Sequence, residues 1–274
     1  MRSGEDVLGK IQKVTLYILL SFDKFCRERN LTYFVDSGTA LGAVRHGGFI
    51  PWDDDIDVGM PRKDYERLLQ LGHELPKELF LQTRDTDSSY KRNAAKLRLR
   101  GTFCQEAEDI IYNENGFFID VFPFDNVPNN KYIANFNVFF LGRLHHLITS
   151  WWYGGNDSST FHRIVVKYFF KKIPKSFIEK LNDKFVELCR KGEKYNTRYI
   201  TSYYWSMTFD HSYLFDSNKM FPVQDILFEG SPVMIMKDYD YYLNKVYGDY
   251  MQLPPENKRH GHHLKGTIDF GKYA

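Results

Sequence analysis

Three aspartates have the residue type and spacing that could hold a divalent metal ion. Asp55 and Asp57 are one residue apart and alternate with apolar residues, so in a β-strand both carboxylates would point to the same face. Asp120 lies within the apolar run 117–122, where a buried lone carboxylate is costly unless it is paired or bound to metal. Carboxylate oxygens are preferred ligands of Mg²⁺ and Mn²⁺. We therefore expect Asp55, Asp57 and Asp120 to hold one or two of these ions.

A second group of residues has the chemistry to bind phosphate. Ser37, Gly38 and Thr39 stand between a β-rich run and a helix-prone segment, where they offer backbone amides, hydroxyls and the positive end of a helix. Basic side chains supply candidate counter-charges: Arg45, Lys96, Arg98 and Arg100, and near the carboxyl end Arg259, His260, His262 and His263. Metal ligands, phosphate donors and counter-charges are the parts that phosphoryl transfer requires, and the pattern indicates this chemistry.

Each of these motifs also has a simpler explanation. An Asp-x-Asp pair is common in solvated turns, and strand alternation leaves Asp53 and Asp54 as residues of the preceding turn. Numbered from Asp53, the run is similar to the start of a calcium loop, but the sixth residue is Val58 rather than Gly and the twelfth is Asp64 rather than Glu. The basic run around Arg98 could equally be a solvated sheet edge, and the basic residues after 258 a solvated tail.

Hydrophobic periodicity predicts the elements that position these residues. Apolar residues at steps of three and four predict a long amphipathic helix over 5–29. Strands are expected over 31–36, 55–58, 96–103 and 117–122, and further helices over 40–46, 64–71, 131–152, 159–172, 175–191 and 239–246. A change to long aromatic and basic segments after Pro123 suggests a boundary near 128. The sequence therefore favours an α+β fold, with a core over 1–128 and a mainly helical, aromatic-rich portion over 129–274.

Composition limits the class of protein. The 274 residues are 43% hydrophobic and 26% charged, as in folded globular proteins, and the aromatic content of 17% is high. A formal net charge of +2, with basic residues dispersed among 35 acids, argues against nucleic-acid binding. Cys26, Cys104 and Cys189 form neither a disulfide framework nor a zinc spacing, so we expect a reducing compartment and no structural metal site.

The hydropathy pattern predicts no membrane span and no secretory signal. The longest apolar run, 136–153, is interrupted by Arg143, His145 and His146, which would be costly in lipid. The basic amphipathic segment 162–180 has two interpretations: a helix that packs its apolar face on the core, or a surface that lies on anionic lipid. We expect a cytoplasmic protein, peripheral at most to the inner face of the membrane.

Several separated motifs resemble one known family. Gly-Thr-Ala-Leu-Gly-Ala-Val-Arg-His from Gly38, and Gly-Phe-Ile-Pro-Trp-Asp-Asp-Asp-Ile-Asp-Val-Gly-Met-Pro-Arg from Gly48, closely resemble the signature of the LicD family, which includes the fukutin-related proteins. Three further motifs follow in the same order: Phe-Phe-Ile-Asp-Val-Phe-Pro over 117–123, Phe-Glu-Gly over 228–230, and Tyr-Gly-Asp-Tyr over 247–250 before a Pro-Pro pair at 254–255. The resemblance spans residues from about 11 to 264.

The resemblance implies a nucleotidyltransferase-like core, a short mixed sheet flanked by helices. In that superfamily a Gly-Ser or Gly-Gly turn opens a helix, an acid-x-acid strand follows, and a later strand carries a third acid. Gly38 and Thr39 stand at the turn, Asp55 and Asp57 at the pair, and Asp120 at the third acid. Thr39 takes a place where Gly or Ser is usual, and it keeps a hydroxyl group.

The resemblance also implies an activity. Members of the family transfer a phosphorylated alcohol, phosphocholine in bacteria and ribitol phosphate in the animal relatives, from a CDP carrier to a glycan. The expected enzyme is thus a Mg²⁺-dependent phosphocholine transferase that uses CDP-choline, releases CMP and modifies a sugar hydroxyl of a free or lipid-linked cell-surface glycan precursor, such as teichoic acid, lipooligosaccharide or capsule. Alternatives are a nucleotidyltransferase, a transferase that uses CDP-ribitol or CDP-glycerol, and a non-catalytic glycan-binding module.

Choline would need a binding surface of its own. A quaternary ammonium cannot donate hydrogen bonds, so proteins usually hold it against aromatic faces. Aromatic residues of the second half offer such faces, although clustered aromatics commonly form cores. The candidates are Trp151, Trp152, Tyr153, Tyr203, Tyr204 and Trp205.

Overall fold

The chain forms two compact units. A computed structural model describes residues 2–106, 112–153, 172–194, 197–204, 213–259 and 266–273. The first unit combines Met1–Tyr90, Ala94–Pro123 and Asn218–Ala274, and the second combines Lys91–Asn93 and Phe124–Ser217. This division reflects which residues contact one another in the fold. The expected boundary near 128 came from the change in amino-acid composition after Pro123, and it stays a prediction.

A five-stranded path of hydrogen-bonded strands forms the centre of the first unit. Its order is β1 (Phe34–Val35), β2 (Asp57–Pro61), β6 (Phe118–Val127), β4 (Ala95–Leu99) and β3 (Leu79–Gln82). β4 pairs antiparallel with β6 on one side and with β3 on the other, and all five of its residues are buried. The interpretation of the basic run around Arg98 as a solvated edge is therefore wrong, because β4 is an interior strand.

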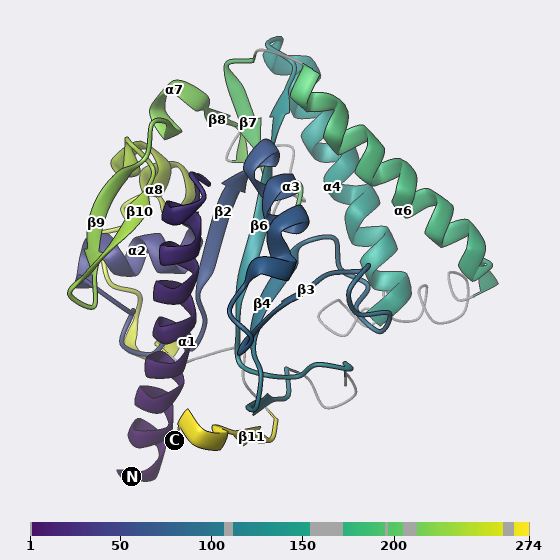
Figure 1. The fold of residues 1–274 in the computed structure, drawn as a ribbon. Coiled ribbons are helices and arrows are strands. Elements are labelled where there is room, and N and C mark those ends of the chain that lie inside the picture. Colours follow the sequence, from purple (N-terminus) through teal and green to yellow (C-terminus); the bar gives the residue numbers. More distant parts are fainter. Residues whose placement is uncertain are drawn as a thin grey trace. The chain divides into compact units, whose positions relative to one another are not determined.

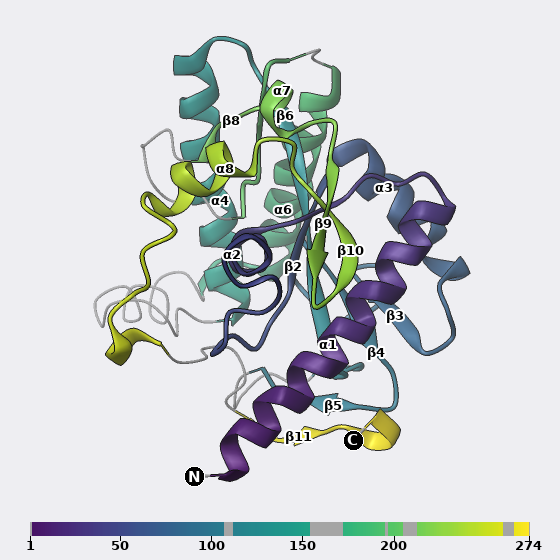
Figure 2. The same ribbon diagram turned by 90° about the vertical axis from the view of Figure 1, so that its left-hand side faces the viewer.

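Helices cover this sheet. α1 (Arg2–Glu28) buries the apolar stripe that its periodicity predicted, and it packs against β4 and against the hairpin strand β10 (Ser231–Ile235). α2 (Ser37–His46) packs against β2 and against α8 (Tyr239–Tyr247), and α3 (Arg62–Leu71) also contacts β2. Figure 2 shows α1 and α3 on one side of β2, and α2 and α8 on the other.

Residues 218–274 add strands as well as helices to the first unit. β9 (Gln224–Phe228) and β10 form an antiparallel hairpin, and β10 contacts β1. β11 (Ile268–Asp269) pairs with β5 (Phe103–Cys104). The short helix α7 (Ser217–Met220) leads into this segment, which also contains the 3-10 turns Glu256–Lys258 and Gly271–Tyr273. A further 3-10 turn, Gly72–Glu74, follows α3. Among the described residues beyond 129, helices are more extensive than strands, as expected, and the hairpin that turns at Glu229 and Gly230 is an addition that the sequence analysis did not predict.

The second unit is built around two long helices. α4 (Lys131–Tyr153) and α6 (Lys175–Arg190) pack side by side (Figure 1). The end of β6 continues into this unit and pairs with β7 (Tyr199–Thr201), which pairs in turn with β8 (Phe215–Asp216). The 3-10 turn Lys191–Lys194 follows α6. Apart from residue 172, the helix expected over 159–172 lies outside the described residues.

Most of the described aromatic candidates for a choline surface belong to the core of the second unit. Tyr203 is buried within this core, and Trp151 and Trp152 pack against it. Trp205 lies outside the described residues. The packing therefore favours the core interpretation of these aromatics.

The expected sheet flanked by helices is confirmed, and the nucleotidyltransferase-like identity of the core stays a prediction. The three cysteines are buried and form no disulfide, as expected. In the described part of the chain, none of the helices has both the length and the apolar character that a membrane crossing requires.

Candidate active site

Strands β2 and β6 bring the three predicted acids together. Asp57 begins β2 and Asp55 lies just before it, so the strand starts two residues later than expected. The Asp120 amide on β6 donates to the Ile56 carbonyl between the two acids, at 2.9 Å. The backbone of Asp120 therefore lies beside the segment that carries Asp55 and Asp57, and their role as metal ligands stays a prediction.

Burial and like charge act on these carboxylates. Burial, with the charges of Asp120 and Asp54, raises the pKa of Asp55 to about 6. Burial, with the charges of Asp55 and Asp120, raises the pKa of Asp57 well above its usual range. Such a site favours a divalent cation, because an ion between the carboxylates would offset their mutual repulsion.

The turn before β2 contributes two more acids. Asp53, Asp54 and Asp55 each offer an oxygen, and these oxygens lie within 4.8 Å of one another. Among the described residues, it is these three acids, and not Asp55, Asp57 and Asp120, whose oxygens lie so close together. Strand alternation left Asp53 and Asp54 aside, although the run of three consecutive aspartates was a visible signal. The candidate metal centre therefore extends from β6 through β2 into the turn.

Asp36 adds a buried carboxylate next to β2. Its amide donates to the Asp57 carbonyl at 2.9 Å, and its side chain is fully buried. The Tyr242 hydroxyl donates to Asp36 Oδ1, whereas Oδ2 has no hydrogen-bond partner among the described residues. Burial raises the pKa of Asp36 to about 6, against the lowering effect of the hydrogen bonds from Tyr242 and Ser37. A buried oxygen without a donor and a set of carboxylate ligands both fit a hard cation such as Mg²⁺ or Mn²⁺.

The predicted phosphate turn forms the first turn of α2. The helix begins at Ser37, which adopts a left-handed φ of 44°. Gly38 allows close approach, because a Cβ there would lie 3.0 Å from Asp53 Oδ2. The Thr39 hydroxyl accepts a hydrogen bond from the Asp57 amide at 2.9 Å. Thr39 thus joins α2 to β2, and the start of α2 lies beside the acidic turn.

Arg45 and Arg259 form a basic pair near the same turn. Arg259 lies over the ring of Trp52, 5.7 Å from its centroid, and Trp52 directly precedes Asp53. Arg45 donates to the Tyr250 carbonyl at 2.8 Å, and its pKa is lowered by burial and by the charge of Arg259. Neither arginine makes an ion pair with an acid in the ranges that the structure describes. Two adjacent guanidinium groups with this arrangement suit an anion such as phosphate.

The structure separates Lys96 and Arg98 from this basic pair. Lys96 Nζ lies 3.0 Å from Asp120 Oδ2, across the β4–β6 register. Arg98 is buried and donates to Gln82, Glu106 and the Gly116 carbonyl. Its nitrogens are engaged inside the protein, which does not favour contact with phosphate. Sequence reasoning missed Glu106, although two basic residues in an interior strand require nearby acids.

The Phe-Glu-Gly motif supports the loop that leads to the acids. Glu229, with a φ of 49°, donates its amide to the Gly47 carbonyl at 2.9 Å. Its carboxylate accepts from the Phe49 amide at 3.1 Å. A Cβ on Gly48 would lie only 1.9 Å from this carboxylate, so Gly48 makes room for it. The β9–β10 turn therefore fixes residues 47–49. His260, His262 and His263 lie outside the described residues.

The fold and this site together define a mixed α/β protein whose candidate metal centre is built of carboxylates, with a basic pair beside it. A family model described as "LicD/FKTN/FKRP, nucleotidyltransferase domain" matches residues 30–146. This stretch contains Asp55, Asp57 and Asp120. Over this stretch the chain matches the LicD family.

Individual relatives agree with this match. The chain is 29% identical over 271 residues to lipopolysaccharide cholinephosphotransferase LicD of Haemophilus influenzae, and the match covers 94% of this chain and 96% of the relative. An uncharacterized protein of Rickettsia prowazekii is 50% identical over 66 residues, 24% of each chain. Ribitol 5-phosphate transferase FKRP of Homo sapiens is 46% identical over 39 residues, 14% of this chain and 8% of the relative. The resemblance to the LicD family that the motifs predicted is confirmed.

Proposed function

We propose that the protein transfers phosphocholine, or a related alcohol phosphate, from a CDP-activated donor to a sugar hydroxyl of a cell-surface glycan precursor and releases CMP. The observation that carries the proposal is the group of mutually repelling carboxylates Asp55, Asp57 and Asp120, of which Asp57 is buried and the others are half-buried, beside the basic pair Arg45 and Arg259. The name of the Haemophilus influenzae relative, which is matched over nearly its whole length, supports a cholinephosphotransferase.

Each part of the site has a role in this reaction. Asp55, Asp57 and Asp120, with Asp53 and Asp54 close by, would hold Mg²⁺ or Mn²⁺, which supplies a positive charge that stabilises the developing phosphate charge.

Arg45 and Arg259 would hold the diphosphate of the donor through their guanidinium groups. The acceptor hydroxyl oxygen attacks the phosphorus that bears the alcohol, and the bond from this phosphorus to the CMP oxygen breaks. Asp120 either ligates the metal or takes the proton of the attacking hydroxyl.

Exchange of Asp57 for Asn tests the proposal. The Asp57→Asn protein should lose about a hundredfold or more in rate, because metal stabilisation of the transition state contributes several kcal/mol. The variant should remain folded, since the change removes one of several repelling charges from a buried group. The assay follows CMP and phosphocholine-modified glycan with Mg²⁺ present, and full turnover by the purified variant would contradict the assignment.

The products separate the alternatives. Release of pyrophosphate or of a nucleoside diphosphate would indicate a nucleotidyltransferase or a sugar-nucleotide transferase instead. Thermal-shift screening with CDP-choline, CDP-ribitol and CDP-glycerol identifies the donor alcohol, because a ligand that binds the folded state raises the melting temperature. Glycan binding without binding of any CDP compound would favour a non-catalytic module.

We also propose a cytoplasmic location, peripheral at most to the inner face of the membrane. Two points support the proposal: a lipid-linked acceptor would have to be bound at the membrane surface, and the sequence of residues 162–180 is basic and amphipathic. Flotation with vesicles of anionic phospholipid tests it: an absence of co-flotation would remove the membrane contact.

A further inference from the structure

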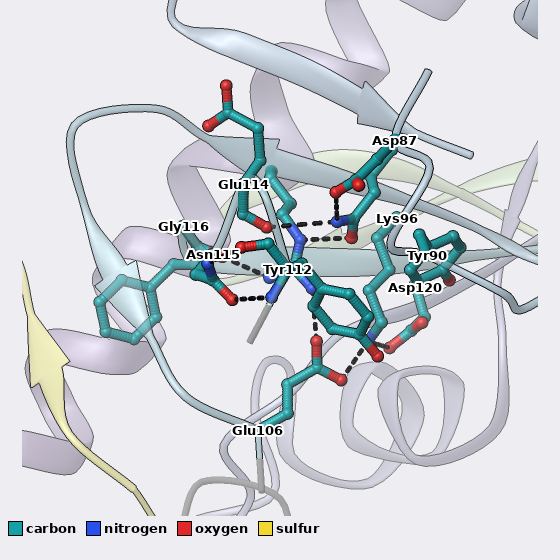
Figure 3. Close-up of polar contacts among 12 residues, drawn as sticks. Asp87, Tyr90, Lys96, Glu106, Tyr112, Glu114, Asn115, Gly116 and Asp120 are labelled. Atoms are coloured by element: carbon teal, nitrogen blue, oxygen red, sulfur yellow. Dashed lines mark hydrogen bonds and ion pairs between the residues drawn. The ribbon is translucent and has the colours of Figure 1, made fainter. Parts of the chain in front are cut away.

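Glu106 connects the candidate metal centre to a buried network of charged side chains. Its two carboxylate oxygens contact different cations: Oε2 lies 3.1 Å from Lys96 Nζ, and Oε1 accepts a hydrogen bond from Arg98. Lys96 in turn lies 3.0 Å from Asp120 Oδ2. Figure 3 shows Lys96 between the carboxylates of Glu106 and Asp120.

Lys96 is held from several directions. Its side chain is 4% exposed, and its ammonium lies 3.3 Å from the centroid of the Phe118 ring. The backbone register places Lys96 directly opposite Asp120 on β6. An ammonium with so little exposure and two carboxylate partners has little freedom to move toward a substrate.

Arg98, the second cation that contacts Glu106, is also held in place by hydrogen bonds. Arg98 donates to Gln82 Oε1 at 2.5 Å and to the Gly116 carbonyl at 2.8 Å. Gln82 continues the chain of hydrogen bonds to Asp87 at 2.7 Å. Because each of these groups is buried or half-buried, the position of Glu106 is fixed by the protein and not by solvent.

The ion pairs of Glu106 and Asp120 join two positive and two negative charges. Lys96 and Arg98 carry positive charge, whereas Glu106 and Asp120 carry negative charge. A buried ion pair that loses one partner leaves an uncompensated charge, which is costly. If Glu106 loses its charge, Lys96 keeps its ion pair with Asp120 but loses the one with Glu106, and Arg98 no longer shares that acid with it. We expect the Lys96–Asp120 contact to tighten or shift in response.

We propose that Glu106 is a positioning residue that acts through Lys96 to orient Asp120 as a metal ligand. The inference rests on the proposed function. Asp120 Oδ2 is occupied by Lys96, which leaves Oδ1 of the same carboxylate for the cation. Residues that orient a metal ligand commonly alter metal affinity by about 10- to 100-fold when they are changed.

Binding of Mn²⁺ to the purified protein, followed by electron paramagnetic resonance in the absence of substrate, tests the inference. Glu106→Gln should weaken Mn²⁺ binding by about 10-fold or more and change the spectrum of the bound ion. Glu106→Asp keeps the charge but shortens the side chain, so it should restore part of the affinity. Thermal unfolding of every variant checks that the measured proteins are folded.

Glu114 offers a matched control. It forms a partly exposed ion pair with Arg100 at 3.5 Å, away from the acids of the centre. Glu114→Gln should therefore keep the Mn²⁺ affinity of the wild type. A general effect of losing one glutamate charge would appear in both variants, whereas a positioning effect appears only at Glu106.

The outcomes distinguish this inference from the proposed function. If the wild type binds no Mn²⁺, or Asp57→Asn binds it as well as the wild type, the metal centre and the inference both fall. If Asp57→Asn loses binding while folded Glu106→Gln keeps wild-type affinity, the inference alone is overturned. Should Glu106→Gln fail to fold, wild-type affinity and spectrum in Glu106→Asp would overturn it instead.

Discussion

At the scale of single residues, Thr39 illustrates how a predicted functional side chain also has a structural task. The sequence suggested its hydroxyl as a phosphate contact, and the structure shows it accepting the amide of Asp57. This amide belongs to the first residue of β2, and it donates to the Thr39 hydroxyl instead of to a carbonyl of a neighbouring strand. Thr39 thereby fixes the position of a candidate metal ligand through the backbone.

Removal of the Thr39 hydroxyl should destabilise the protein. Thr39→Val leaves the buried Asp57 amide without its acceptor, which should lower the free energy of unfolding by about 1–3 kcal/mol. Thr39→Ser keeps the hydroxyl and should stay closer to the wild type. Urea unfolding in metal-free buffer measures both variants, and equal stability of the Val and Ser proteins would contradict this role.

At the scale of elements, helices were easier to predict than the exact starts of strands. The periodicity of apolar residues predicted α1 because the helix buries one continuous stripe. The Asp-x-Asp alternation placed Asp55 inside β2, but the strand begins at Asp57 because hydrogen-bond pairing, not side-chain alternation, determines where it starts. Glu106 was missed because the need for an acid beside Lys96 and Arg98 follows from their burial, which the sequence analysis did not assign to this strand.

Helix α4 carries a histidine, His145, whose buried imidazole should make the stability of the protein depend on pH. His145 stacks on Phe185, and its Nε2 has no hydrogen-bond partner within the described ranges. Burial, with the charge of Arg92, lowers its pKa from 6.5 to about 3. At neutral pH the imidazole is uncharged in both folded and unfolded chains.

Stability should therefore fall as the pH drops from 6.5 toward 3. In that window the unfolded chain binds a proton at His145 and the folded chain does not, with a slope of at most about 1.4 kcal/mol per pH unit. His145→Phe should remove this part of the pH dependence. Urea unfolding across the window measures it, with His73→Gln, an exposed site, as the control; an unchanged slope in His145→Phe would contradict the assignment.

At the scale of the whole molecule, the first unit is assembled from distant parts of the sequence. β1 contacts β10 and α2 contacts α8, so residues 218–274 complete a unit that begins at the amino terminus. Local sequence patterns predicted many of the helices and strands. They did not predict that residues 218–274 pack on the amino-terminal part of the chain, because contacts between distant segments leave no periodic pattern in the sequence of either segment.

The segment 1–128 should not fold alone. Without the hairpin and α8, β1 and α2 lose their apolar cover, and Asp36 loses Tyr242. We expect a poorly dispersed NMR spectrum for isolated 1–128 and a cooperative transition for the full chain. Co-expression of 218–274 as a separate segment should recover part of the folded protein, and a well-folded isolated 1–128 would refute the expectation.

The contact between Tyr242 and Asp36 also has a consequence for synthesis on the ribosome. The two residues are 206 positions apart, so the carboxylate emerges long before the hydroxyl that covers it. At translation speeds of about 5–20 residues per second, the nascent chain spends at least about 10 seconds with this acid uncovered. Mutations that slow translation in the last fifth of the gene would prolong that interval and increase the demand on chaperones, without altering the finished protein.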